Sequence, residues 1–197
     1  MTFVGRPNVG KSTLVNAICG KKVSIVSNKP QTTRTRVRGV YHGDDAQIVF
    51  VDTPGIHKPV TALGERVNAT ALDSINDVEV VCLIIDATKP FGRGDQWVAN
   101  NVDMSDAFVV INKIDRPDAR PQEVLDEIYN LFLDLNVKDH QFDFPVIYTN
   151  ARKRIAVKSP EEMEQGKDLT LLFDTILDYF PGPKVEDEGL KIGRAHV

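Results

Sequence analysis

The chain has 197 residues and a formal net charge of −4 at pH 7, with 42% hydrophobic and 26% charged residues. This length suits one medium-sized domain with a sizeable core, and a net negative chain has no overall field that would attract nucleic acid. No apolar run approaches the roughly 20 residues of a membrane span, and no signal peptide precedes the first motif. Cys19 and Cys82 lie in apolar stretches, so we expect core cysteines, a reducing compartment and a cytoplasmic protein.

A glycine-rich motif lies close to the start of the chain. Residues 5–12 read Gly-Arg-Pro-Asn-Val-Gly-Lys-Ser, the G-x-x-x-x-G-K-S pattern of a phosphate-binding loop. Residues 1–4 predict a short strand before it, and residues 11–19 predict a helix that Gly20 ends. In this context backbone N–H groups and the positive end of the helix dipole converge on phosphate oxygens. The phosphate-binding residues predicted from this loop are Asn8, Val9, Gly10, Lys11, Ser12 and Thr13.

A polar loop and a hairpin follow. Residues 21–36 contain Pro30, three threonines and several basic side chains without a steady period, which indicates a long functional loop. Residues 37–42 and 47–52 are rich in β-forming side chains and flank Gly43-Asp44-Asp45, a hairpin signal. Such a hairpin gives a mainly parallel sheet one antiparallel edge strand.

The second hairpin strand ends in Asp52-Thr53-Pro54-Gly55. An acid at the carboxyl end of a strand beside a phosphate loop is placed to take part in binding Mg²⁺. We therefore predict Asp52 and the Ser12 hydroxyl as Mg²⁺ ligands, while Lys11 reaches the β- and γ-phosphates. Gly55 can bring its backbone N–H against a terminal phosphate without a side-chain clash, so it joins the predicted phosphate-binding residues.

The rest of the chain alternates between predicted helices and buried strands. Apolar spacing predicts helices over residues 62–76, 95–102, 121–135 and 169–180, and continuous apolar runs predict strands over 78–86, 107–111 and 145–149. Trp97 is expected to pack in the core. With the three earlier strands, this alternation predicts a three-layer α/β domain with a six-stranded, mainly parallel sheet and one antiparallel edge strand.

The segment after the predicted strand over 107–111 indicates which nucleotide base is bound. It reads Asn112-Lys113-Ile114-Asp115. The Asp115 carboxylate can accept two hydrogen bonds from guanine, whereas adenine has no donors in those places, and such polar pairing discriminates by roughly 10⁴ or more. Thr149-Asn150-Ala151 follows the last strand and can offer the Ala151 N–H to the guanine oxygen. The predicted guanine-binding residues are Asn112, Lys113, Asp115, Asn150, Ala151 and Arg152, which favour GTP over ATP.

Residues 5 to about 100 resemble the Era family of bacterial GTPases, which act in small-subunit ribosome assembly. The resemblance depends on the phosphate loop, on Pro30-Gln31-Thr32-Thr33-Arg34, and on residues 52–59. It implies a P-loop GTPase domain over residues 1–183 that binds GTP or GDP with Mg²⁺ and has the ribosome or its RNA as partner; we expect a monomer. It also implies that Thr33, or alternatively Thr32, closes on Mg²⁺ when the γ-phosphate is present.

That resemblance completes the predicted chemistry. The metal ligands are then Ser12, Thr33 and Asp52, and the catalytic residues are Lys11, Thr33, Gly55 and Asn8. A basic cluster in the polar loop could contact RNA or a partner, although an exposed solvated face is equally compatible; it comprises Lys29, Arg34, Arg36 and Arg38.

Water activation is expected to be weak. In Ras-like enzymes a Gln directly after Asp-x-x-Gly orients the attacking water, but this chain has Ile56 there and His57 one residue later. GTPases that resemble this chain and have Asn at position 8 use it to help hold K⁺ beside the β- and γ-phosphates. Bracing of the loop by Asn8 is the alternative. We expect slow intrinsic hydrolysis.

The second half of the chain resembles another family, the BipA (TypA) translational GTPases. The similarity covers residues 111–121, 143–148 and 168–183. It predicts a chimeric GTPase domain with a join near residues 102–106, followed by a truncated linker over 184–190. Residues 191–197 resemble a translated sequencing adapter, or a cloning scar. Three functions stay open: a GTPase switch, a GTP- or GDP-binding module with negligible turnover, and an inert fusion.

Overall fold

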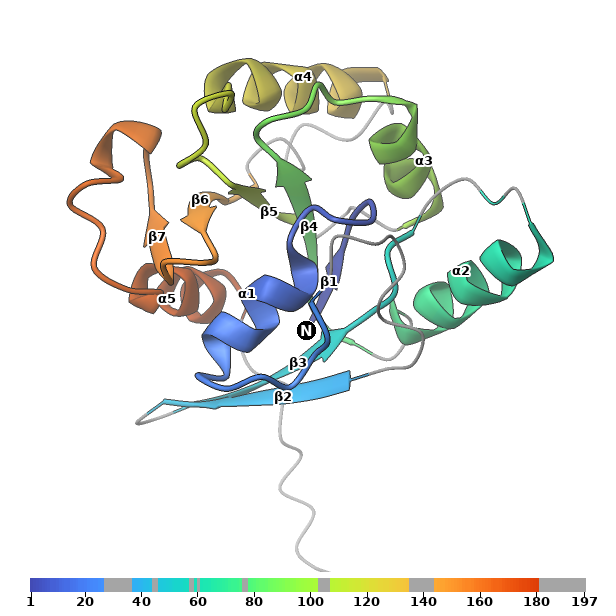
Figure 1. The fold of residues 1–197 in the computed structure, drawn as a ribbon, viewed down its shortest axis with the longest axis horizontal. Helices are drawn as coiled ribbons and strands as arrows, with labels where there is room; N and C mark the ends of the chain where they lie inside the picture. Colours follow the sequence, from blue (N-terminus) through green and yellow to red (C-terminus); the bar gives the residue numbers. More distant parts are fainter. Residues whose placement is uncertain are drawn as a thin grey trace, which may run out of the picture.

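One mixed sheet of seven strands organises the described part of the chain, in the order β2-β3-β1-β4-β5-β6-β7 (Figure 1). The structure is a computed structural model, and it describes residues 1–26, 37–43, 46–56, 59, 61–75, 78–102, 107–134 and 144–180. The strands are β1 (Thr2–Val4), β2 (Val37–His42), β3 (Gln47–Asp52), β4 (Val81–Asp86), β5 (Ala107–Asn112), β6 (Val146–Asn150) and β7 (Ile155–Val157). β1, β3, β4, β5 and β6 run parallel, whereas β2 and β7 pair antiparallel at the two edges.

Helices cover both faces of this sheet (Figure 1). They are α1 (Lys11–Ile18), α2 (Ala62–Ile75), α3 (Arg93–Asn101), α4 (Pro121–Asp134), α5 (Thr170–Tyr179) and a short 3₁₀ turn over Pro160–Glu162. Side chains of α2, α3 and α4 share one hydrophobic cluster with β4 and β5. Side chains of α1 and α5 share the other cluster with β1, β3 and the opposite faces of β4 and β5. The predicted three-layer arrangement is therefore confirmed.

The central strands have this place because they are apolar on both faces. In β4, Leu83 and Ile85 belong to one cluster, and Cys82 and Ile84 belong to the other. All four side chains have 0% exposure, the burial that a strand between two helical layers needs. The hairpin is also as predicted, since Val37 pairs with Asp52 and His42 with Gln47.

The prediction of six strands and a single antiparallel edge was wrong, because β7 adds a seventh strand and a second antiparallel edge. Its three residues are too few for an alternating pattern, and they follow a basic turn, Arg152-Lys153-Arg154. Arg154 has a left-handed backbone (φ 60°) in that turn, which a bulky side chain adopts rarely. The strand depends on pairing with β6, from Tyr148–Val157 to Asn150–Ile155.

The two sides of the predicted join share one core. Val98 and Val102 precede residues 103–106, which lie outside the described residues, and Val109 and Val124 follow them. All four are buried in the same hydrophobic cluster. Within the described parts of the chain, no helix has the length and apolar character needed to cross a bilayer.

Candidate nucleotide-binding site

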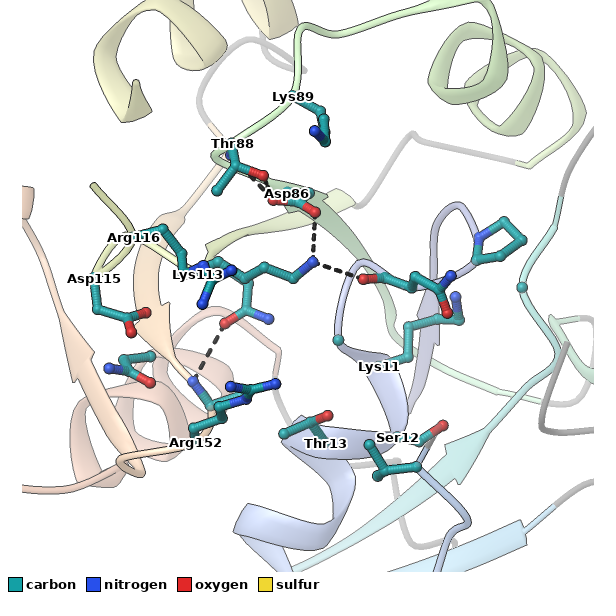
Figure 2. A pocket seen from close by; sticks show the side chains of 18 of the residues that line it. Lys11, Ser12, Thr13, Asp86, Thr88, Lys89, Lys113, Asp115, Arg116 and Arg152 are labelled. Atoms are coloured by element: carbon teal, nitrogen blue, oxygen red, sulfur yellow. Dashed lines mark hydrogen bonds and ion pairs between the residues drawn. The ribbon is translucent and has the colours of Figure 1, made fainter. Parts of the chain in front are cut away.

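A cavity of about 370 Å³ opens where the loops after the parallel strands meet, a size within the range of small-molecule sites. Figure 2 shows Lys113 pointing between Asp86 and the phosphate loop, with Lys11 and Ser12 on one side of the cavity and Asp115 on the other. The lining residues are Pro7, Asn8, Gly10, Lys11, Ser12, Thr13, Val26, Thr53, Gly55, Asp86, Thr88, Lys89, Asn112, Lys113, Asp115, Arg116, Asp118, Asn150, Ala151 and Arg152.

The phosphate loop has a backbone that depends on its glycines. Gly10 has φ 111°, and a Cβ atom there would lie 2.2 Å from Nδ2 of Asn112. At Gly5 (φ 148°) a Cβ atom would lie 2.5 Å from the Ile84 carbonyl oxygen. Asn8 is left-handed as well, with φ 67°. The loop therefore turns tightly between β1 and the first residue of α1, and the N-terminus of α1 faces the cavity.

Lys11 is held inside this loop. Its Nζ atom donates to the carbonyl oxygens of Gly5 (2.9 Å) and Arg6 (2.7 Å), and the residue is 6% exposed. Burial lowers the pKa of Lys11 to about 8, while the nearby Asp52 carboxylate acts in the opposite direction. The ammonium group is thus fixed at the cavity wall with one donor left over.

The Asp52–Gly55 segment packs directly on the phosphate loop. Asp52 is buried at the end of β3 and, unlike Gly55, does not line the cavity itself. A Cβ atom on Gly55 would lie 2.8 Å from the Pro7 backbone, so only glycine permits this approach. Ile56 donates its backbone N–H to the Gly5 carbonyl (3.2 Å), and its side chain has 0% exposure. The position that carries Gln in Ras-like enzymes is part of the core here.

Asn112 joins the phosphate loop to both predicted guanine loops. Its Nδ2 donates to the Val9 carbonyl (2.9 Å), while its Oδ1 accepts from Thr149 Oγ1 (3.1 Å) and from Ala151 N (3.3 Å). Val9 is buried and does not line the cavity. Asp115 is exposed in the cavity, where a ligand can reach its carboxylate.

Lys113 forms a second connection. Its Nζ donates to the Asn8 carbonyl (2.8 Å) and to Asp86 Oδ2 (2.5 Å). Asp86 Oδ1 accepts from the N–H and hydroxyl of Thr88. Burial raises the pKa of the Asp86 carboxyl, but the hydrogen bonds from Lys113 and Thr88 outweigh it and leave that pKa below its usual value.

Sequence reasoning missed Asp86. The signal was present, because Asp86 stands at the carboxyl end of a buried strand next to β1, as Asp52 does. It also missed the lining residues Thr88, Lys89, Arg116 and Asp118. Thr33, Thr32, Lys29, Arg34, Arg36 and His57 lie outside the described residues, so their predicted roles stay predictions; Arg38 is exposed on β2.

Comparisons with known proteins agree with this geometry. The family model described as 50S ribosome-binding GTPase matches residues 1–113. GTPase Era of Alkaliphilus metalliredigens is 46% identical over 134 residues, which cover 67% of this chain and 44% of that protein. GTPase Era of Clostridium botulinum is 41% identical over 193 residues, 96% of this chain and 59% of the relative. The chain thus spans about half the length of these relatives.

Solved structures of Era are similar as well. Era in complex with MgGDPNP and nucleotides 1506–1542 of 16S ribosomal RNA has 34% identity and a TM-score of 0.73, covering 93% of this chain and 57% of that one. An Aquifex aeolicus Era variant bound to GDP and AlF₄⁻ has 34% identity and a TM-score of 0.71, with the same coverage.

The Clostridium botulinum alignment covers both sides of residues 102–106. The resemblance of the second half to BipA stays a prediction. By the family model and the solved structures, the chain belongs to the 50S ribosome-binding GTPases, as an Era-type GTPase of the P-loop superfamily.

Proposed function

We propose that this chain is the GTP-binding and GTP-hydrolysing switch domain of an Era-like ribosome-assembly protein. The observation that carries the proposal is the single cavity shared by the phosphate loop and the Asn112–Asp115 loop. Asn112 and Lys113 link the two loops at 2.8–2.9 Å. A ligand that spans both loops needs phosphates at one end and guanine at the other.

The phosphate end suits GDP and GTP. The proposed phosphate-binding groups are the backbone of residues 8–13, the Lys11 ammonium and the Gly55 N–H, and all but Val9 belong to residues that line the cavity. Charge-assisted hydrogen bonds from Lys11 are the strongest available there. Lys11 and Gly55, with Thr33 and Asn8, are the proposed catalytic residues, acting by position and charge on an in-line attack by water.

The guanine end is proposed from Asp115 and the loop after β6. Asp115 would accept from the guanine N1–H and 2-amino groups, and Ala151 and Arg152 lie on the same wall of the cavity. Asn150 is 2% exposed, and its Nδ2 atom has no hydrogen-bond partner among the described residues. A buried donor of this kind calls for an acceptor, which a guanine oxygen or the Asp115 carboxylate would supply.

Mg²⁺ fits the proposed phosphate end. Ser12 lines the cavity, and the Asp52 carboxylate is near enough to Lys11 to affect its pKa; both offer the hard oxygen ligands that Mg²⁺ prefers. Within the described ranges, no group of three or more His, Cys, Asp or Glu side chains is arranged to hold a metal ion. Mg²⁺ would take its remaining ligands from phosphates and water. When bound, Mg²⁺ neutralises charge on the phosphates, and Thr33 is the proposed third protein ligand.

Slow hydrolysis follows from the buried Ile56, which has no group to orient water. Asn8 lines the cavity, and we propose it as a K⁺ ligand beside the β- and γ-phosphates. The same burial of Ile56 favours the second candidate function, a GTP- or GDP-binding module with negligible turnover.

The biological context is proposed from the relatives. One solved Era structure contains a segment of 16S ribosomal RNA, so the ribosome or its RNA is the proposed partner of the protein to which this domain belongs. We propose a cytoplasmic monomer. Four aspects of the domain organisation stay predictions. They are the GTPase domain over residues 1–183, the BipA-like origin of its second half, the linker over 184–190 and the adapter-like tail over 191–197.

Calorimetry with GDP, GTP and ATP tests the proposal. We expect binding of GDP and GTP that needs Mg²⁺ for full strength, and no detectable binding of ATP. Phosphate release from GTP then separates the switch from the module without turnover. Equal affinities for ATP and GTP would refute the guanine assignment, and no binding of either would favour the inert fusion.

A further inference from the structure

The phosphate loop carries an arginine that turns away from the cavity. Arg6 is not among the cavity-lining residues, and its Nε atom lies 2.8 Å from Oδ1 of Asp95 in α3. The Asp95 side chain has 0% exposure, whereas that of Arg6 has 26%. A buried carboxylate with one cationic partner is costly to leave alone, so the two side chains are held together.

Asp95 is itself fixed in place. Its Oδ2 atom accepts the backbone N–H of Gly92 (3.0 Å), which caps the start of α3. The preceding residue, Phe91, donates its N–H to Glu127 of α4 (2.6 Å). The start of α3 is therefore tied to a second helix and offers Arg6 a rigid partner.

The aliphatic part of the Arg6 side chain is confined as well as its guanidinium group. A Cβ atom on Gly94 would lie 2.7 Å from Arg6 Cδ, so the aliphatic part of the side chain rests on the α3 backbone. The Arg6 carbonyl oxygen, meanwhile, is the nearer of the two acceptors that hold Lys11 Nζ, at 2.7 Å. One residue thus connects α3 to the ammonium group that is proposed to meet the phosphates.

We infer that Arg6 and Asp95 are a positioning pair that fixes the Arg6 carbonyl, and through it Lys11, for binding of the β-phosphate. The inference rests on the proposed function. Neither residue touches the nucleotide; they act through the backbone of the phosphate loop. We expect the effect to be largest for phosphates beyond the first, because the Arg6 carbonyl holds Lys11, which is proposed to meet the β- and γ-phosphates.

The test compares GDP with GMP, which lacks the β-phosphate, by competition against a fluorescent guanine nucleotide. Arg6→Met keeps the aliphatic stem and removes the charge, and Asp95→Asn keeps the cap and removes the opposite charge. We expect each variant to lower the ratio of GDP affinity to GMP affinity by about tenfold or more, the scale of one charged hydrogen bond. The double variant should have a ratio of GDP affinity to GMP affinity no lower than that of the single variant with the lower ratio. Arg6→Lys should recover part of the ratio.

Arg93→Ala is the matched control, because Arg93 is exposed and lies two residues before Asp95 on the same helix. It should leave the ratio unchanged. Simple loss of folded protein would lower GDP and GMP affinities by the same factor, so an unchanged ratio in Arg6→Met overturns the inference even if that variant is unstable. A parent protein that binds neither nucleotide would instead refute the proposed function, and the positioning role with it.

Discussion

Asn112→Ala is the most informative single change, because one buried side chain, that of Asn112, joins three loops of the site. Its side chain donates to the Val9 carbonyl and accepts from the Thr149 hydroxyl and the Ala151 N–H, at 2.9–3.3 Å. The residue is 2% exposed, so each of the three partners loses its hydrogen bond in a largely buried place. With about 1 kcal/mol for each neutral hydrogen bond, the expected loss in the free energy of unfolding is roughly 3 kcal/mol.

The folded variant should also bind nucleotide more weakly, because the phosphate loop and the guanine loops would no longer be held at a fixed spacing. Urea unfolding measures the first effect, and calorimetry with GDP at a temperature where the variant is folded measures the second. Asn101→Ala is the matched control: Asn101 is exposed, and its side chain donates to the Trp97 carbonyl within α3, so the free energy of unfolding should change by no more than about 0.5 kcal/mol. If Asn112→Ala changed the free energy of unfolding by no more than about 0.5 kcal/mol relative to the parent, the reasoning would be refuted.

Three further predictions address the base, the phosphates and the core. Asp115→Asn should weaken GTP and favour xanthosine nucleotides, since an amide complements the xanthine carbonyl; competition binding checks this, and an undiminished preference for GTP would contradict the assignment. Because the pKa of Lys11 is about 8 and bound phosphates would raise it, GDP affinity should decrease as the pH rises above 8, by up to about tenfold per pH unit; Lys11→Met should make this decrease smaller, and a GDP affinity that rises above pH 8 would count against the assignment. Val98→Ala should cost roughly 1–3 kcal/mol in one cooperative transition, because Val98 packs in one cluster with residues beyond the join; two separate transitions in the parent would show that the halves fold independently.

Local patterns predicted the elements that carry their own signals. The phosphate loop has its glycines at positions where a Cβ atom would collide with neighbours, and the hairpin strands begin and end at the predicted residues. Gly20 follows α1 with φ 66°, the conformation in which glycine commonly ends a helix. In these places a few neighbouring residues are enough to determine the backbone geometry, so the sequence alone could predict it.

Features that depend on distant partners escaped sequence reasoning. β7 forms because its three residues find β6, and nothing in those residues alone distinguishes them from a loop. Asp86 and Asp95 look like ordinary acids in sequence, at a strand end and in the first turn of a helix. Only the fold shows that one meets Lys113 and the other meets Arg6.

The hydrogen bonds of Lys11 and Lys113 bear on how a nucleotide would enter. Each ammonium group has three donors, and two on each lysine are already directed at protein oxygens: Gly5 and Arg6 for Lys11, Asn8 and Asp86 for Lys113. A phosphate oxygen can therefore be added to Lys11 without breaking its bonds to the loop. Since little side-chain freedom is left to lose, binding would carry a smaller entropic cost than it would with mobile lysines. A variant that frees either lysine from these bonds should bind nucleotide more weakly, because the lysine side chain would then lose conformational freedom each time a nucleotide binds.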